Sequence, residues 1–236
     1  MARPTLLRRA GAEAIAVFAL VFCVGGAAAE EASGHAVLGL PAQAAVSGLA
    51  IMGLIYAVGH LSGAHINPAV TIAFTLTRHF PRGEALGYVA AQLAGAAFAG
   101  LLLLAVWPDR PGHLGANRIG VGAGSALVVE IVLSALLMFV IMAVATDTRA
   151  VGEAAAIAIG GTVGLDAMFG GPVTGASMNP ARSLGPAIAG GDYAAVWVYI
   201  AAPLLGAAVS AAVYQFLRAE ARPHVAEQSP AARDAA

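Results

Sequence analysis

Long apolar stretches separated by short polar ones recur along the chain. A membrane-spanning helix needs about 20 apolar residues, and six segments approach that length: 8–29, 37–59, 83–106, 123–145, 153–171 and 193–217. Two more apolar stretches, 67–77 and 179–189, offer only about ten helical residues, roughly half of the bilayer core. Half-spans are tolerated only where they are buried in protein or line a wet cavity. The pattern predicts an all-α integral membrane protein with six transmembrane helices and two re-entrant half-helices.

The composition agrees with this pattern. Hydrophobic residues make up 59% of the 236 residues and charged residues 11%, with a mean hydropathy of +0.81, whereas soluble domains have about 25% charged residues. The first apolar segment follows basic residues, as in a signal peptide, but it is long enough to span and is interpreted as a retained helix. A net charge of −1 argues against nucleic acid as a partner. The single cysteine, Cys23, excludes an intramolecular disulfide.

The arginines predict the orientation of the chain. With six spans, nine arginines fall on one side of the membrane: Arg3, Arg8, Arg9, Arg78, Arg82, Arg149, Arg218, Arg222 and Arg233. The opposite side has only Arg110 and Arg118. Because basic residues favour the cytoplasmic side, both termini are expected to be cytoplasmic. We expect a plasma membrane location, specifically the bacterial inner membrane.

The two halves of the chain repeat one another. Residues 62–69, SGAHINPA, match residues 174–181, TGASMNPA. Residues 88–96, YVAAQLAGA, match residues 199–207, YIAAPLLGA. Since each half has three full spans, the second half must enter from the opposite face of the membrane. This is an inverted repeat, which brings the two half-helices together near the midplane.

The repeat also sets the expected domain boundaries. Residues 1–218 form one membrane domain with halves at about 1–115 and 116–218, and residues 219–236 are a polar tail expected to be disordered and cytoplasmic. Glu13 matches Glu130, each near the start of the first helix of its half. We expect both to be buried acceptors for backbone N–H groups of the re-entrant loops.

Each half contains the same three-residue motif, which is Asn67-Pro68-Ala69 in the first and Asn179-Pro180-Ala181 in the second. Asparagine is a favoured N-cap, and proline at the first helical position loses no needed N–H. The half-helices therefore begin at Asn67 and Asn179, and inversion brings their positive ends together. These ends, each equivalent to about half a charge, oppose cations and protons. The asparagine amides can donate to a passing oxygen, so the predicted permeant is neutral and carries oxygen.

These motifs resemble the major intrinsic protein family, the aquaporins and aquaglyceroporins. The resemblance covers about residues 10–217 and includes both motifs, the two glutamates and the Tyr-x-x-x-Gln/Pro pair. It implies six spanning helices, two half-helices, one pore per subunit and a homotetramer in the lipid bilayer. It also implies a passive channel for water and small neutral solutes.

The resemblance assigns a four-residue constriction to Ser47, Ala167, Ala176 and Arg182. Water-selective members usually have an aromatic residue at the Ser47 position and histidine at the Ala167 position. Serine and two alanines leave a wider opening in which Arg182 is a strong donor. The stretch GPVTGASMNPARSLGPA most resembles the nodulin-like intrinsic proteins and their bacterial relatives. That group is associated with boric, silicic and arsenous acid, and we expect glycerol and water to pass as well.

Two other residues are singled out near the motifs. His65 lies two residues before Asn67 and is expected to line the inner vestibule, where its protonation is one hypothesis for gating. Asp166 stands where nodulin-like relatives tend to have asparagine. It is expected to cap an interfacial network, to partner Arg182 or to bias the filter.

Three alternatives stay open: a mainly water-selective channel, a secondary transporter and a structural protein with a vestigial pore. Inverted repeats with broken helices also suit a transporter, but no acidic coupling residue accompanies the half-helices. The histidines, the cysteine and the acids show no metal-ligand spacing, and no nucleophile–base pair is evident. We therefore expect no enzyme activity, no metal and no cofactor.

Overall fold

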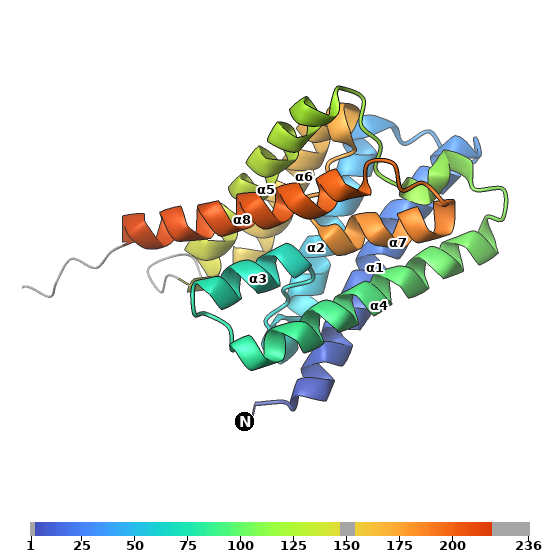
Figure 1. Ribbon diagram of the computed structural model, residues 1–236. Helices are drawn as coiled ribbons and strands as arrows, with labels where there is room; N and C mark the ends of the chain where they lie inside the picture. The colour runs from blue at the N-terminus through green and yellow to red at the C-terminus, as the bar shows by residue number, and fades with distance from the viewer. Residues whose placement is uncertain (1–2, 147–153, 219–236) are drawn as a thin grey trace, which may run out of the picture.

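The computed structural model describes residues 3–146 and 154–218, and these ranges are helical for most of their length (Figure 1). The helices are α1 (Leu6–Ala32), α2 (Gly39–Ser62), α3 (Pro68–Leu76), α4 (Arg82–Val106), α5 (Ala123–Thr146), α6 (Ala155–Thr174), α7 (Pro180–Gly190) and α8 (Val196–Arg218). Within the described ranges, six of them are long and apolar enough to cross a membrane. This confirms the predicted fold class. The predicted tail, 219–236, lies outside the described residues.

The predicted spans and the observed helices agree to within a few residues. The main difference is in α1, which was expected over 8–29 and extends to Leu6 and Ala32. Its first turn is capped by Thr5, whose hydroxyl accepts from the Arg8 N–H at 3.5 Å. The number of apolar residues indicates how much of a helix lies in hydrocarbon, whereas the capping residues determine where the helix begins and ends. The prediction from apolar length therefore missed polar end turns.

One short element was not predicted. Residues Pro111–Gly115, labelled η1, form a turn of left-handed backbone, in which Gly112, His113 and Leu114 have φ values of 56°, 50° and 54°. This turn packs against α1 and contacts α7. Its sequence contains no hydrophobic period, so only the packing against α1 specifies its conformation.

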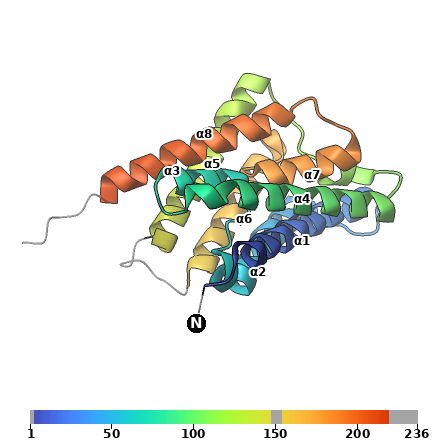
Figure 2. The same cartoon turned by 60° about the horizontal axis from the view of Figure 1, so that its bottom comes forward.

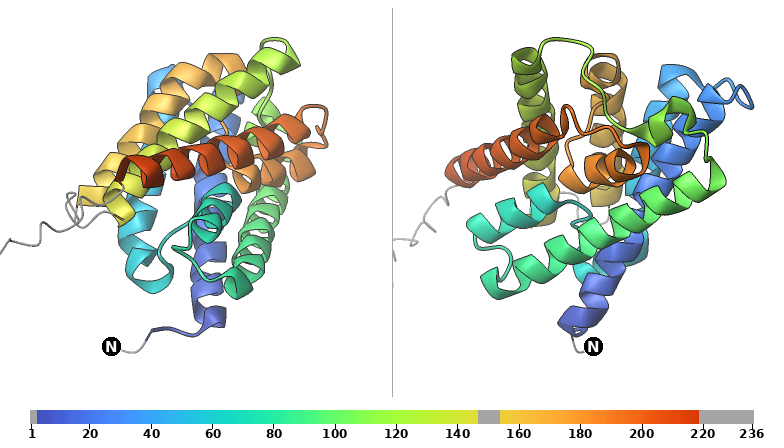
Figure 3. Two further views of the ribbon diagram at one scale, coloured as in Figure 1. Left: turned by 60° about the vertical axis from the view of Figure 1, so that its left-hand side comes forward. Right: turned by 45° about the vertical axis from the view of Figure 1, so that its right-hand side comes forward.

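The packing of the helices repeats between the two halves. Helix α1 lies along α4, as Figure 2 makes plain, and α5 lies in the same way along α8. Each half-helix crosses into the other half, since α7 packs on α4 and α3 packs on α8. The left view of Figure 3 shows α6 beside α5 and α2, which closes the bundle around the half-helices.

Close approach of helices α2 and α6 depends on glycine. A Cβ added at Gly48 would lie 2.6 Å from the carbonyl oxygen of Gly160, and a Cβ at Gly160 would lie 2.6 Å from that of Gly48. Two backbones at this separation leave no room for a side chain between them. Such close contact through small residues is common between membrane helices.

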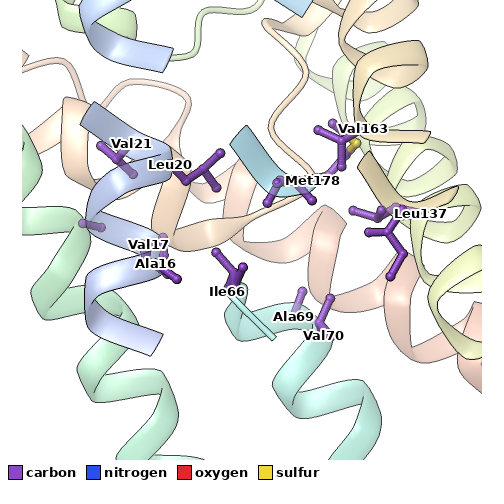
Figure 4. Close-up of a cluster of buried hydrophobic side chains, with 14 of the residues drawn as sticks. Ala16, Val17, Leu20, Val21, Ile66, Ala69, Val70, Leu137, Val163 and Met178 are labelled. Carbon is purple, nitrogen blue, oxygen red and sulfur yellow. The ribbon is translucent and has the colours of Figure 1, made fainter. Parts of the chain in front are cut away.

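The core surrounds the point where the half-helices meet. Ile66 and Met178, the residues just before the two asparagines, are 1% and 4% exposed. Figure 4 shows them between side chains of α1, such as Leu20, and the side chains of Val163 and Leu137. The irregular backbone before each half-helix is therefore enclosed by protein, as membrane depth requires.

Candidate pore and its constriction

The two half-helices begin at a common centre. Figure 1 shows α3 and α7 running apart from a shared position near the middle of the molecule. Asn67 caps α3, with its Oδ1 accepting from the Ala69 N–H at 2.9 Å, and Asn179 caps α7 by accepting from the Ala181 N–H at 3.0 Å. Pro68 and Pro180 occupy the first helical positions. Because both N-termini face the same place, their partial positive charges add there.

The asparagines also join the two halves. The amide Nδ2 of Asn67 donates to the carbonyl oxygen of Met178 at 2.8 Å, and that of Asn179 donates to the carbonyl of Ile66 at 2.8 Å. An amide has two N–H groups, so each asparagine keeps one for another acceptor. Both asparagines line the same cavity, where that acceptor can be a solute oxygen.

Two buried carboxylates hold the loops that precede the half-helices. Glu13 accepts from the N–H groups of His65 and Ile66 at 2.9 and 2.6 Å. Glu130 accepts from the N–H groups of Ser177 and Met178, both at 2.9 Å. These four N–H groups have no helical partner, so the carboxylates supply charge-assisted acceptors for backbone that would otherwise be unpaired.

Each loop is fixed a second time by a tyrosine from the last helix of its half. Tyr88 donates to the carbonyl of Ser62 at 2.8 Å, and Tyr199 donates to the carbonyl of Thr174 at 2.6 Å. The halves differ at one point. Gln92 donates to Glu13 at 2.8 Å, whereas the matching residue of the second half is Pro203, which has no side-chain donor. Glu13 is therefore bound by more donors than Glu130.

Three cavities follow one another along the molecule. The central cavity, about 130 Å³, passes both asparagines, and its wall is mostly aliphatic. A cavity of about 490 Å³, here called the Arg182 vestibule, adjoins it at Arg182. A third cavity of about 500 Å³, the His65 vestibule, adjoins the central cavity at Gly63 and His65. Among the described residues, the three cavities thus lie in succession and share lining residues where they adjoin.

The boundary between the central cavity and the Arg182 vestibule is formed by residues that line both. They are Val24, Ser47, Ala167, Ala176 and Arg182. Four of them are the residues expected to form the constriction. Val24 of α1 was not anticipated, because nothing in its sequence context distinguishes it from the other apolar residues of that helix. Three of the five have a side chain no larger than serine.

Arg182 is held from outside its own helix. Its Nη1 donates to the carbonyl of Gly115 at 2.8 Å and to Oδ1 of Asn117 at 2.5 Å. Asn117 also accepts from Ser183 Oγ at 2.8 Å and donates to the carbonyl of Gly175 at 2.8 Å. Among the described residues, the side-chain hydrogen bonds of Arg182 all come from Nη1, so Nε and Nη2 stay available to a solute.

Asn117 was missed in the sequence analysis. It follows η1 in a polar stretch between spans, and no repeat or family motif includes it. The only available indication was the position of this asparagine two residues after Gly115, which is a weak turn signal.

His65 lies where the central cavity meets the His65 vestibule, as expected. Its Nδ1 is 3.0 Å from the Thr71 hydroxyl, and its ring packs against the rings of Phe74, Phe80 and Tyr88 at centroid distances of 5.1, 4.7 and 5.2 Å. This aromatic enclosure fixes the ring position.

The structure does not support a pairing of Asp166 with Arg182. Arg182 is bonded to Gly115 and Asn117, and Asp166 is 2% exposed with an Oδ2 that has no hydrogen-bond partner among the described residues. Asp166 does not line the central cavity or the vestibules, so its carboxyl group turns away from the path. Within the same residues, no group of three or more His, Cys, Asp or Glu side chains could hold a metal ion.

Comparison with known proteins identifies relatives over most of the chain. The sequence model of the Major intrinsic protein family matches residues 1–214. Aquaporin NIP1-4 of Oryza sativa subsp. japonica is 47% identical over 91% of this chain and 78% of its own length. Nodulin-26 of Glycine max is 45% identical over 92% of this chain and 80% of its own length. These relatives are plant proteins and give no support to the bacterial membrane expected from the sequence.

A solved structure has the same fold. The X-ray structure of the aquaglyceroporin from Plasmodium falciparum superposes with a TM-score of 0.80 and covers 91% of this chain and 98% of its own. Its sequence is 24% identical. The likeness therefore establishes the fold alone.

Proposed function

The chain belongs to the major intrinsic protein family of membrane channels, and we propose that its pore conducts small uncharged molecules with several hydroxyl groups. The class includes boric, silicic and arsenous acid, with glycerol and water passing as well. The observation behind this proposal is the small size of Ser47, Ala167 and Ala176, which line both cavities that meet at the constriction.

The chemistry of the constriction favours hydroxyl groups. Ser47 offers one hydroxyl, and Arg182 offers Nε and Nη2 as donors. A solute with oxygens on several sides can accept from Arg182 while its apolar or central part passes the two alanine methyl groups. Since Ser47, Ala167 and Ala176 all have small side chains, a planar or pyramidal acid beside Arg182 has more room than a single file of water requires.

Exclusion of protons and cations follows from the centre of the pore. Two helix N-termini point there, and each asparagine has one free N–H group. A water molecule that accepts from both amides directs its own protons away from the centre, which interrupts a proton wire. A cation would meet positive potential without a carboxylate on the lumen to offset it, because Glu13 and Glu130 are buried behind the loops.

The assembly is part of the same proposal. We infer a homotetramer of independent pores in the lipid bilayer, with both termini cytoplasmic and halves at about 1–115 and 116–218. The orientation follows from the arginine distribution. It places the Arg182 vestibule outside the cell and the His65 vestibule inside.

Stopped-flow light scattering on proteoliposomes tests the proposal, with water, glycerol, boric acid and arsenous acid compared on one preparation. We expect rapid flux of the acids that is proportional to their gradient and insensitive to ionophores. Ser47→Trp should reduce flux of the solutes far more than flux of water, because the indole fills the opening between the cavities. Fast water flux without solute flux would establish the water-selective alternative, and ionophore-sensitive flux would establish a transporter.

A further inference from the structure

We propose that the Arg182 vestibule is a binding site for neutral polyhydroxy solutes, and that Glu31 is its principal hydrogen-bond acceptor. The inference rests on the proposed function, since it concerns the molecules that the pore would conduct. The vestibule has about 490 Å³ of space and lies outside the constriction rather than within it. Glu31 lines it and belongs to none of the motifs described above.

The position of Glu31 is fixed by the next helix. It lies in the last turn of α1. The right view of Figure 3 shows the end of this helix close to the start of α2 and to η1. Its Oε1 accepts from the Gly39 N–H at 2.8 Å, and its Oε2 accepts from the side-chain amide of Gln43. Each carboxylate oxygen has a second lone pair, so both can accept one more hydrogen bond from the vestibule.

Glu31 also orients Gln43. The side-chain nitrogen of Gln43 points to Glu31. The amide oxygen of Gln43, Oε1, therefore points away from Glu31 and is free to act as an acceptor. One turn further along α2, Ser47 donates to the main-chain oxygen of Gln43 at 3.3 Å. Glu31, Gln43 and Ser47 therefore place acceptors in succession on one wall, from the vestibule to the constriction.

The lining of the vestibule also has donors. Arg182 lines the vestibule, and Asn117 holds its Nη1 so that Nε and Nη2 remain for a ligand. A molecule with several hydroxyls can donate to Glu31 and accept from Arg182. Hydrogen bonds to charged groups are about twice as strong as those between neutral groups. Because Glu31 and Arg182 carry opposite charges, the site favours a ligand that has both hydrogen-bond donors and acceptors, as a neutral polyhydroxy molecule does.

The experiment compares Glu31→Gln with wild type in proteoliposomes, with glycerol and boric acid as the probes over a wide concentration range. A site outside the constriction makes solute flux saturable. We expect Glu31→Gln to lower solute permeability at low concentration by about five- to tenfold. The half-saturating concentration should rise by a similar factor, while water permeability stays at the wild-type value.

Glu30→Gln is the matched control. Glu30 precedes Glu31 in α1, does not line the vestibule, and pairs with the exposed His35 at 3.4 Å. This variant should keep both wild-type permeability and wild-type saturation.

The outcomes separate the two proposals. Unchanged solute flux and saturation in Glu31→Gln overturn the vestibule site and leave the proposed function standing. A wild-type protein that conducts water but no solute overturns the proposed function. If Glu31→Gln also loses water flux, competition on wild type decides: sorbitol at equal concentration on both faces should reduce glycerol flux, and unreduced flux overturns the site.

Discussion

Asn67 and Asn179 each donate a hydrogen bond to the loop that precedes the other. The amide of Asn67 donates to Met178, the residue before Asn179, and the amide of Asn179 donates to Ile66, the residue before Asn67. Both distances are 2.8 Å. The two residues that would contact a solute at the centre are therefore also the link between the halves. Changes at either one should affect conduction and stability together.

Asn67→Asp tests both roles. Aspartate still caps α3 by accepting from the Ala69 N–H, but it cannot donate to Met178, whose carbonyl is left without its partner. A buried unpaired acceptor should lower the free energy of unfolding by about 2 kcal/mol. The added carboxylate should also attract cations to the centre and increase proton leak.

Thermal unfolding in detergent and a pH-sensitive dye inside proteoliposomes measure the two effects. Asn179→Asp is the matched variant in the other half and should behave similarly. Unchanged leak in both variants would mean that the helix ends alone exclude cations.

Gly160→Ala and Gly161→Ala form a matched pair of neighbours in α6. The new Cβ at position 160 would lie 2.6 Å from the Gly48 oxygen and 2.7 Å from Met52 Cβ, whereas position 161 has no atom within 4 Å. Overpacking should lower the free energy of unfolding in Gly160→Ala by about 1–3 kcal/mol. Gly161→Ala should be neutral or slightly stabilising, because alanine is the better helix former. Thermal melts in one detergent compare them, and equal melting temperatures would contradict the α2–α6 packing.

Glu13→Gln and Glu130→Gln compare the two loop acceptors. Glutamine keeps one acceptor oxygen but turns an NH2 group toward N–H donors, so buried hydrogen bonds are lost in both variants. Glu13→Gln should be the more harmful, because Glu13 also accepts from Gln92 at 2.8 Å. The hydroxyl bonds match between the halves, since Ser62 donates to Glu13 and Thr174 donates to Glu130, both at 2.7 Å. We expect a loss of about 2–4 kcal/mol in the free energy of unfolding, measured by thermal unfolding with Glu30→Gln, at a half-buried position, as control. A larger effect at Glu130 would refute the ranking.

Much of the fold could be predicted because its determinants are local or repeated. Apolar length indicated the spans, and Asn-Pro at 67–68 and 179–180 marked where the half-helices begin, since capping depends on adjacent residues. The three full spans in each half then required inversion.

The missed features depend on contacts between distant segments. Val24 reaches the constriction only because of how α1 is rotated against α2, and Asn117 reaches Arg182 only because η1 packs on α1. Glu31 and Gln43 are twelve residues apart, and only the angle between α1 and α2 brings them together. A hydrophobic pattern specifies which face is buried but not which polar groups meet across helices.

Asn117 offers the sharpest test of how the constriction is organised. Leucine has a similar size but cannot bind Arg182, Ser183 or Gly175, so Asn117→Leu should free the guanidinium while leaving the helices in place. A mobile Arg182 has a less defined position in the opening, and we expect the ratio of boric acid to water permeability to change about threefold or more. Arg182→Val, which removes the guanidinium, sets the limit of that change and should also weaken solute selection and increase proton leak. Stopped-flow light scattering on wild type, Asn117→Leu and Arg182→Val measures this permeability ratio for each protein. If Asn117→Leu keeps the wild-type ratio while Arg182→Val changes it, Gly115 alone positions the arginine.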